Sequence, residues 1–139
     1  MTEARGPAER NMILIAEDEP MVVRVITMAV SNAGFRVCVV NDGVAGFEEF
    51  RKFADEICLV LTDVVMPDGG GIEMALKIRE IDPDVKILFM SGYSDAALEV
   101  QARTNYPFIR KPFLPADLIR KINDVLGISG SASAGGSQP

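Results

Sequence analysis

Two kinds of apolar pattern alternate along most of this chain. Five short runs are almost wholly apolar and rich in β-branched or aromatic residues, which is typical of buried strands. The segments between and after them have apolar positions every three or four residues, which predicts amphipathic helices. The strand candidates are residues 12–16, 35–40, 57–62, 85–90 and 107–110. The helices are predicted from residue 20 to a stop at Gly34, over 43–54, 71–80 and 94–103, and from Leu114 to a stop at Gly127.

This alternation predicts a parallel sheet, because strands separated by helices form βαβ units with helices on both faces. Arg36 interrupts the second strand, and Pro107 and Arg110 bound the fifth, so these two strands should lie at the edges. We predict an α/β fold, a flavodoxin-like doubly wound sheet of five parallel strands in the order 2-1-3-4-5 with five helices. Ligands of such sheets bind beyond the carboxyl ends of the strands, between strands one and three.

Composition narrows the class of protein. The chain has 139 residues, of which 48% are hydrophobic, enough for one domain without a disulfide or metal staple. Its net charge of -6 opposes binding to nucleic acid or to an anionic membrane surface. No apolar run approaches the roughly 20 residues that span a bilayer, and Cys38 and Cys58 lie in apolar runs, as buried free thiols do. We expect a cytoplasmic protein with neither a direct nucleic-acid partner nor a membrane partner.

Chemistry must come from carboxylates, hydroxyls and amines, because the chain contains no histidine. Such groups follow the strands at their carboxyl ends: Glu17 and Asp18, Asp63, Ser91 and Lys111. Neighbouring strands about 4.8 Å apart would bring Asp18 and Asp63 together. Clustered carboxylates repel, so either one of them is protonated or a hard cation such as Mg²⁺ neutralises them.

Each of these residues also has a simpler explanation. Asp18 and Glu19, just before Pro20, can cap a helix, Ser91 can belong to a turn, and Lys111 can be a solvated lysine at a sheet edge. Asp63 is different, because an apolar and then glycine-rich loop follows it instead of a helix. The joint occurrence of these residues at four strand ends favours a functional site.

Four motifs stand at these strand ends: Glu17-Asp18, Asp63-Val64-Val65-Met66-Pro67 with Gly71, Ser91-Gly92, and Lys111-Pro112-Phe113. Together they resemble the response-regulator receiver domains of two-component signalling, over about residues 11–126. The resemblance implies that Asp63 accepts a phosphoryl group from a sensor histidine kinase or a histidine phosphotransfer protein. It also implies that the protein is not an enzyme but a phosphoacceptor that assists its own Mg²⁺-dependent phosphorylation and dephosphorylation.

The resemblance assigns roles to the other residues. Asp18, Asp63 and the backbone carbonyl of Val65 would ligate Mg²⁺, with Mn²⁺ as a substitute, and Glu17 would act through water. Ser91 and Lys111 would bind the phosphoryl oxygens, and the Lys111-Pro112 bond would be cis. Val65 and Tyr93 would flank the phosphoryl group, where an apolar and a bulky side chain should slow its hydrolysis.

A switch to a partner-binding face is part of the same resemblance. Ser91 would move toward the phosphoryl group and Phe108 would turn inward with it, which alters a face formed by the fourth helix, the fifth strand and the fifth helix. Basic residues should mark this face for a downstream protein effector: Arg103, Arg110, Arg120 and Lys121.

Three alternative functions are available to a fold of this kind. A dehalogenase-type phosphatase needs a D-x-D-x-T motif, but Val65 stands two residues after Asp63, and a flavin phosphate would be repelled by the acidic residues after the first strand. A protein-interaction domain that works without phosphorylation stays the alternative.

Residues 1–10 and the Gly/Ser/Ala-rich 127–139 are expected to be flexible. The cognate kinase, the pathway, the oligomeric state, and whether the domain stands alone or belongs to a longer kinase or regulator, stay open.

Overall fold

A computed structural model describes residues 10–66, 70–92 and 94–128. Strands and helices alternate along it as the sequence predicts: β1 (Met12–Ala16), α1 (Pro20–Asn32), β2 (Arg36–Val40), α2 (Gly43–Phe53), β3 (Ile57–Asp63), α3 (Gly71–Ile81), β4 (Ile87–Ser91), α4 (Ser94–Arg103), β5 (Phe108–Arg110) and α5 (Pro115–Leu126). The strands form one sheet in the order β2-β1-β3-β4-β5, and every pairing is parallel. The predicted fold class and both edge strands are confirmed.

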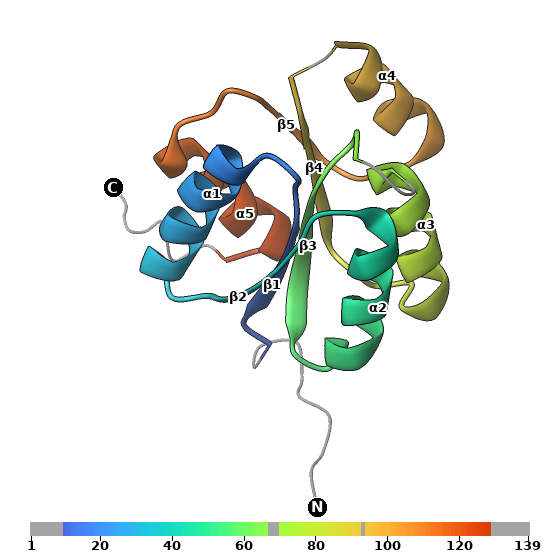
Figure 1. Ribbon diagram of the computed structural model, residues 1–139, viewed down its shortest axis with the longest axis horizontal. Helices are drawn as coiled ribbons and strands as arrows, with labels where there is room; N and C mark the ends of the chain where they lie inside the picture. Colours follow the sequence, from blue (N-terminus) through green and yellow to red (C-terminus); the bar gives the residue numbers. More distant parts are fainter. Residues whose placement is uncertain (1–9, 67–69, 93, 129–139) are drawn as a thin grey trace, which may run out of the picture.

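The sheet separates two apolar cores, because successive side chains of a strand point to opposite faces. Helices α1 and α5 cover one face, where Ile26 and Leu118 pack with Ile15. Helices α2, α3 and α4 cover the other, where Phe50 and Ile72 pack among buried strand residues (Figure 1). The middle strands are therefore buried on both sides, as their unbroken apolar runs require.

Some boundaries differ from the prediction by one or two residues, each for a local reason. β4 begins at Ile87 instead of 85, because the amide of Val85 donates to the carbonyl of Asp82 at 3.1 Å and closes a turn. β5 begins at Phe108, since Pro107 has no N–H for the ladder. β3 extends to Asp63, one residue further than predicted, so the candidate phosphoacceptor is the last residue of a central strand.

Glycines end the first and last helices as predicted. Gly34, two residues after α1, has φ 99°, and Gly127, directly after α5, has φ 74°. Both angles lie in the left-handed region that glycine adopts without steric penalty. The amide of Ile128 donates back to the carbonyl of Asn123 at 2.9 Å, which closes the end of α5.

The two cysteines are free, half-buried thiols. Burial raises the pKa of both, and that of Cys58 reaches about 11, so neither is an activated nucleophile. Among the helices that the structure describes, none has the length and apolarity needed to cross a membrane.

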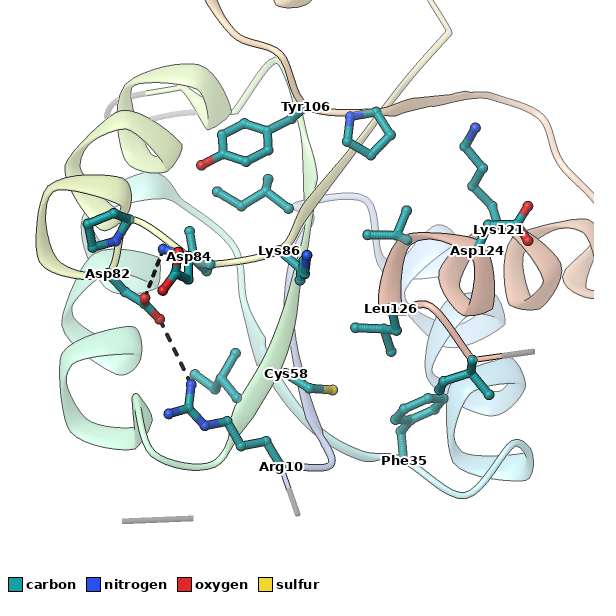
Figure 2. A pocket seen from close by; sticks show the side chains of 17 residues that line it. Arg10, Phe35, Cys58, Asp82, Asp84, Lys86, Tyr106, Lys121, Asp124 and Leu126 are labelled. Carbon is teal, nitrogen blue, oxygen red and sulfur yellow. Dashed lines mark hydrogen bonds and ion pairs between the residues drawn. The ribbon is translucent and has the colours of Figure 1, made fainter. Parts of the chain in front are cut away.

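A groove of about 1190 Å³ opens at the amino-terminal ends of β3 and β4 (Figure 2). Its lining mixes apolar side chains with both signs of charge, including Arg10 and Asp82, whose side chains pair at 3.9 Å. Lys121 of the predicted partner-binding face lines it, but none of the residues predicted to bind the metal or the phosphoryl group does. The groove lies at the end of the sheet opposite to the carboxyl ends, where ligands of this fold bind.

Candidate functional site

The candidate residues converge at the carboxyl ends of four strands. Glu17 and Asp18 directly follow β1, and Asp63 ends the neighbouring β3. Ser91 ends β4, and Lys111 directly follows β5. Carboxylate oxygens of Glu17, Asp18 and Asp63 lie within 4.8 Å of one another. The sheet order therefore assembles the predicted acidic cluster, because it places β1 beside β3.

Lys111 ties this cluster together. Its Nζ donates to Glu17 Oε1 at 2.8 Å and to Asp63 Oδ2 at 3.0 Å. Its backbone amide donates to the carbonyl of Ser91 at 3.0 Å, which fixes the end of β5 against the end of β4. The Lys111-Pro112 peptide bond is cis, as the resemblance implied.

Burial separates the two acidic residues after β1. The amide of Glu17 donates to the carbonyl of Val40 at 3.1 Å and so extends the β1–β2 ladder, and its side chain is only 1% exposed. Its second oxygen, Oε2, accepts from the amide of Glu19 at 3.1 Å. Asp18 is exposed at the rim. The side chain of Glu19, the N-cap of α1, makes no capping hydrogen bond, so a capping role for it is not observed.

The electrostatics of the cluster favour a hard cation. Burial raises the pKa of Glu17, although the hydrogen bond from Lys111 lowers it in part. Burial alone would lower the pKa of Lys111, but its bonds to Glu17 and Asp63 raise the pKa by more than burial lowers it. The amine therefore stays protonated. Three carboxylates facing one ammonium leave net negative charge, and an all-oxygen donor set suits Mg²⁺ or Mn²⁺.

The segment after β3 holds Asp63 closely. Asp63 is 9% exposed, and its Oδ1 accepts from the amide of Val65 at 3.3 Å. The amide of Gly71 donates to the carbonyl of Val64 at 2.9 Å, and a Cβ on Gly71 would overlap the carbonyl oxygen of Asp63. Glycine is therefore required where α3 begins. The backbone carbonyl of Val65 stays a predicted metal ligand. The side chain of Val65 is exposed.

The two predicted switch residues lie on the neighbouring strands β4 and β5. Ser91 is buried, and it pairs with Arg110 in the β4–β5 register. Phe108 pairs with Phe89 in the same register and packs, half-buried, against the core under α2, α3 and α4. Tyr93, the second predicted flanking residue, lies outside the described residues.

The predicted basic face is less basic than expected. Arg103 pairs with Glu73 and Glu99, and Arg120 pairs with Asp117, so these two positive charges are offset by acidic neighbours within the chain. Glu73 lies 30 positions from Arg103 in the chain, whereas Glu99 and Asp117 lie within one helical turn of the arginines they pair with.

Sequence reasoning missed Thr62. This residue is fully buried, and its Oγ1 donates to the carbonyl oxygen of Asp63 at 2.8 Å. The available signal was a hydroxyl residue directly before Asp63 in an otherwise apolar strand.

Replacing Lys111 by methionine is expected to destabilise the folded protein by about 2 kcal/mol at pH 7 without divalent cations. The buried Glu17 carboxylate would lose its ammonium partner, a change that costs about 3–5 kcal/mol for fully buried pairs, whereas the Lys111 side chain is 20% exposed. Glu17 would take up a proton in the folded variant at pH values where the unfolded chain does not. The stability of the variant should therefore fall as the pH rises above 4.5, and its deficit should be smaller at pH 5.

Urea denaturation in EDTA at the two pH values measures this deficit. Lys86→Met, which removes an exposed lysine before β4, serves as the control and should stay close to the wild type. A Lys111→Met variant as stable as the wild type at pH 7 would show that the ammonium does not stabilise the cluster.

Comparison with known proteins agrees with this geometry. A model of the response regulator receiver domain matches residues 13–123. Response regulator receiver protein CpdR of Brucella abortus is 36% identical over 116 residues, covering 82% of this chain and 95% of CpdR. Sensor kinase CckA of the same bacterium is 30% identical over 116 residues, which are 82% of this chain but 12% of the kinase. The crystal structure of a response regulator receiver protein from Sinorhizobium medicae superimposes with a TM-score of 0.78 at 31% identity, covering 87% of this chain and 98% of that one. The chain therefore belongs to the response regulator receiver domain family.

Proposed function

We propose that this protein is a phosphoacceptor that receives a phosphoryl group on Asp63 from a sensor histidine kinase or a histidine phosphotransfer protein. The observation that carries the proposal is the cluster itself, in which Asp63 lies among two further carboxylates and the Lys111 ammonium. Asp18, Asp63 and the carbonyl of Val65 would hold Mg²⁺. A bound Mg²⁺ would supply positive charge that lets an anionic phosphoryl donor approach and that neutralises the transferring oxygens.

The transfer follows from the positions of these groups. An oxygen of Asp63 forms a bond to phosphorus while the bond from phosphorus to the donor imidazole nitrogen breaks, and that nitrogen keeps the electron pair. Lys111 is placed to exchange its bond with the Asp63 carboxylate for one to a phosphoryl oxygen. The Ser91 hydroxyl at the end of β4 would bind a second oxygen. Little covalent work remains for the protein, so positioning and charge account for the rate.

Labelling with a small phosphoryl donor tests the proposal. The protein is incubated with acetyl phosphate in Mg²⁺ or in EDTA, and its intact mass is measured. A phosphoryl adduct that requires Mg²⁺ is expected. If no adduct forms under either condition, the protein would instead be an interaction domain that works without phosphorylation.

Helix α1 offers a surface for the phosphoryl donor beside the acidic cluster. Met21, Val25 and Met28 are all exposed, and their spacing places them on one face of the helix. Pro20 at the start of α1 lies two positions after Asp18. An apolar helix face next to the phosphoacceptor supports docking of a protein donor. The downstream effector would bind the face formed by α4, β5 and α5.

Phosphorylation is expected to reach that face through β4 and β5. Ser91 ends β4 and Phe108 starts β5, and the backbone bond from Lys111 to Ser91 joins the two strand ends. Addition of beryllofluoride, a phosphoryl mimic, should therefore shift amide NMR signals from Asp63 through Ser91 to Phe108. Shifts confined to the acidic cluster would exclude this route.

The phosphorylated form is expected to be comparatively long-lived. Hydrolysis needs a water in line with phosphorus, and the 59% exposed side chain of Val65 beside Asp63 offers that water no hydrogen bond. Val65→Asn should speed the decay severalfold, measured by intact mass after the donor is removed.

Val44→Asn provides the matched control for this decay. Val44 is 61% exposed in the first turn of α2, which follows the edge strand β2, and β1 separates that strand from β3 and Asp63. The control should decay at the wild-type rate. A Val65→Asn variant that decays no faster than the wild type would show that other side chains govern access of water.

A further inference from the structure

A hydroxyl stands where the pattern of β3 calls for an apolar group. β3 reads ICLVLTD, and Thr62 is fully buried directly before Asp63. Valine has nearly the same shape, and a buried hydroxyl is unfavourable unless it is hydrogen-bonded. The Thr62 Oγ1 donates to the carbonyl oxygen of Asp63 at 2.8 Å, so the hydroxyl is satisfied by the backbone of the phosphoacceptor itself.

Thr62 and the first residue of α3 both contact the backbone carbonyl of Asp63. In the sheet register Thr62 pairs with Ala16 of β1 and with Phe89 of β4, both in the core under α2, α3 and α4. A Cβ on Gly71 would stand 3.0 Å from Thr62 Oγ1 and would overlap the carbonyl oxygen of Asp63. The Asp63 carbonyl is therefore enclosed between the Thr62 hydroxyl and the first residue of α3.

The orientation of this carbonyl affects the path of the backbone after Asp63. It belongs to the peptide plane that joins Asp63 to Val64, and a peptide plane is rigid. The amide of Val65, one residue further, donates to Asp63 Oδ1. The Thr62 hydroxyl thus restrains the Asp63–Val64 peptide plane, and the bond from the Val65 amide restrains the Asp63 carboxylate next to it.

We propose that Thr62 is a positioning residue for phosphoryl transfer, which acts through the backbone of Asp63 and contacts neither the metal nor the phosphoryl group. This inference rests on the proposed function of Asp63. The hydroxyl holds the Asp63–Val64 peptide plane in the orientation that directs both the Asp63 carboxylate and the Val65 carbonyl toward one cation. Loss of the hydroxyl should weaken the site without removing any of its ligands.

The test compares Thr62→Val, Thr62→Ser and Thr62→Ala by Mg²⁺ titration calorimetry and by the rate of labelling with acetyl phosphate. The valine and alanine variants should bind Mg²⁺ more weakly and be labelled several times more slowly than the wild type. The serine variant differs from the alanine variant only in its hydroxyl. Its Mg²⁺ affinity and labelling rate should therefore both be close to those of the wild type. The Ser/Ala pair keeps the test valid even if Thr62→Val folds poorly.

Thr104→Val is the matched control. Thr104 is also buried, and its Oγ1 donates to the carbonyl of Val100 at 2.8 Å and accepts from the amide of Tyr106 at 3.2 Å. It follows α4, away from the acidic cluster. This variant should lose thermal stability yet keep the wild-type Mg²⁺ affinity and labelling rate.

Several results would overturn the inference. They are a Thr62→Val or Thr62→Ala variant with wild-type Mg²⁺ affinity and labelling rate, an equal loss in Thr104→Val, or a folded Thr62→Ser variant that resembles alanine. In each case a labelled wild type leaves the proposed function of Asp63 intact. A wild type that acetyl phosphate does not label overturns both.

Discussion

Asp18→Ala is expected to weaken Mg²⁺ binding at least about tenfold, equivalent to about 1.4 kcal/mol, and to slow phosphorylation at limiting Mg²⁺ to the same extent. Asp18 is the exposed member of the acidic cluster, with a carboxylate oxygen within 4.8 Å of those of Glu17 and Asp63. Its removal takes one negative charge away from a divalent cation. It also relieves repulsion between carboxylates in the metal-free protein, so the free energy of unfolding should stay equal or rise slightly.

Calorimetric titration and labelling at several Mg²⁺ concentrations measure this effect. If Asp18 acts by binding the metal, a high Mg²⁺ concentration should restore most of the labelling rate. Asp55→Ala is the control, because Asp55 is exposed just before β3, at the opposite end of the sheet. An Asp18→Ala variant with unchanged Mg²⁺ affinity would exclude Asp18 from the site.

The sequence predicted the site because strand order alone assembles it. Arg36 and Pro107 identified the edge strands, and the remaining order put the end of β1 beside the end of β3. Each functional group then followed from its position directly at or after a strand, which is a property of the chain and not of side-chain packing. This is why the convergence of Asp18, Asp63 and Lys111 at one edge of the sheet follows from the sequence without knowledge of any contact.

The unpredicted features depend on side-chain directions that periodicity does not encode. Glu17 and Asp18 read as one acidic pair, but the structure buries Glu17 because its amide continues the β1–β2 ladder, and it leaves Asp18 exposed. The bond from Lys111 to Glu17 joins residues 94 positions apart. The Thr62 hydroxyl was overlooked because threonine fits a buried strand by shape, and only its partner reveals a role.

In the proposed function, the acidic cluster serves to place a phosphoryl group on Asp63. Asp63→Asn keeps the size of the side chain, including an oxygen that can accept from the Val65 amide or from Lys111, but removes the nucleophilic carboxylate. The variant should therefore stay folded while losing phosphorylation altogether. If the circular dichroism spectrum of Asp63→Asn matches that of the wild type, the loss of phosphorylation cannot be attributed to unfolding.

Intact-mass measurement after incubation with acetyl phosphate and Mg²⁺ tests this claim most directly. The wild type should gain the mass of one phosphoryl group, and hydroxylamine should remove it, as it removes acyl phosphates. Asp63→Asn should gain none under the same conditions. An adduct that forms on Asp63→Asn at the wild-type rate, or one on the wild type that resists hydroxylamine, would contradict the assignment of Asp63 as the phosphoacceptor.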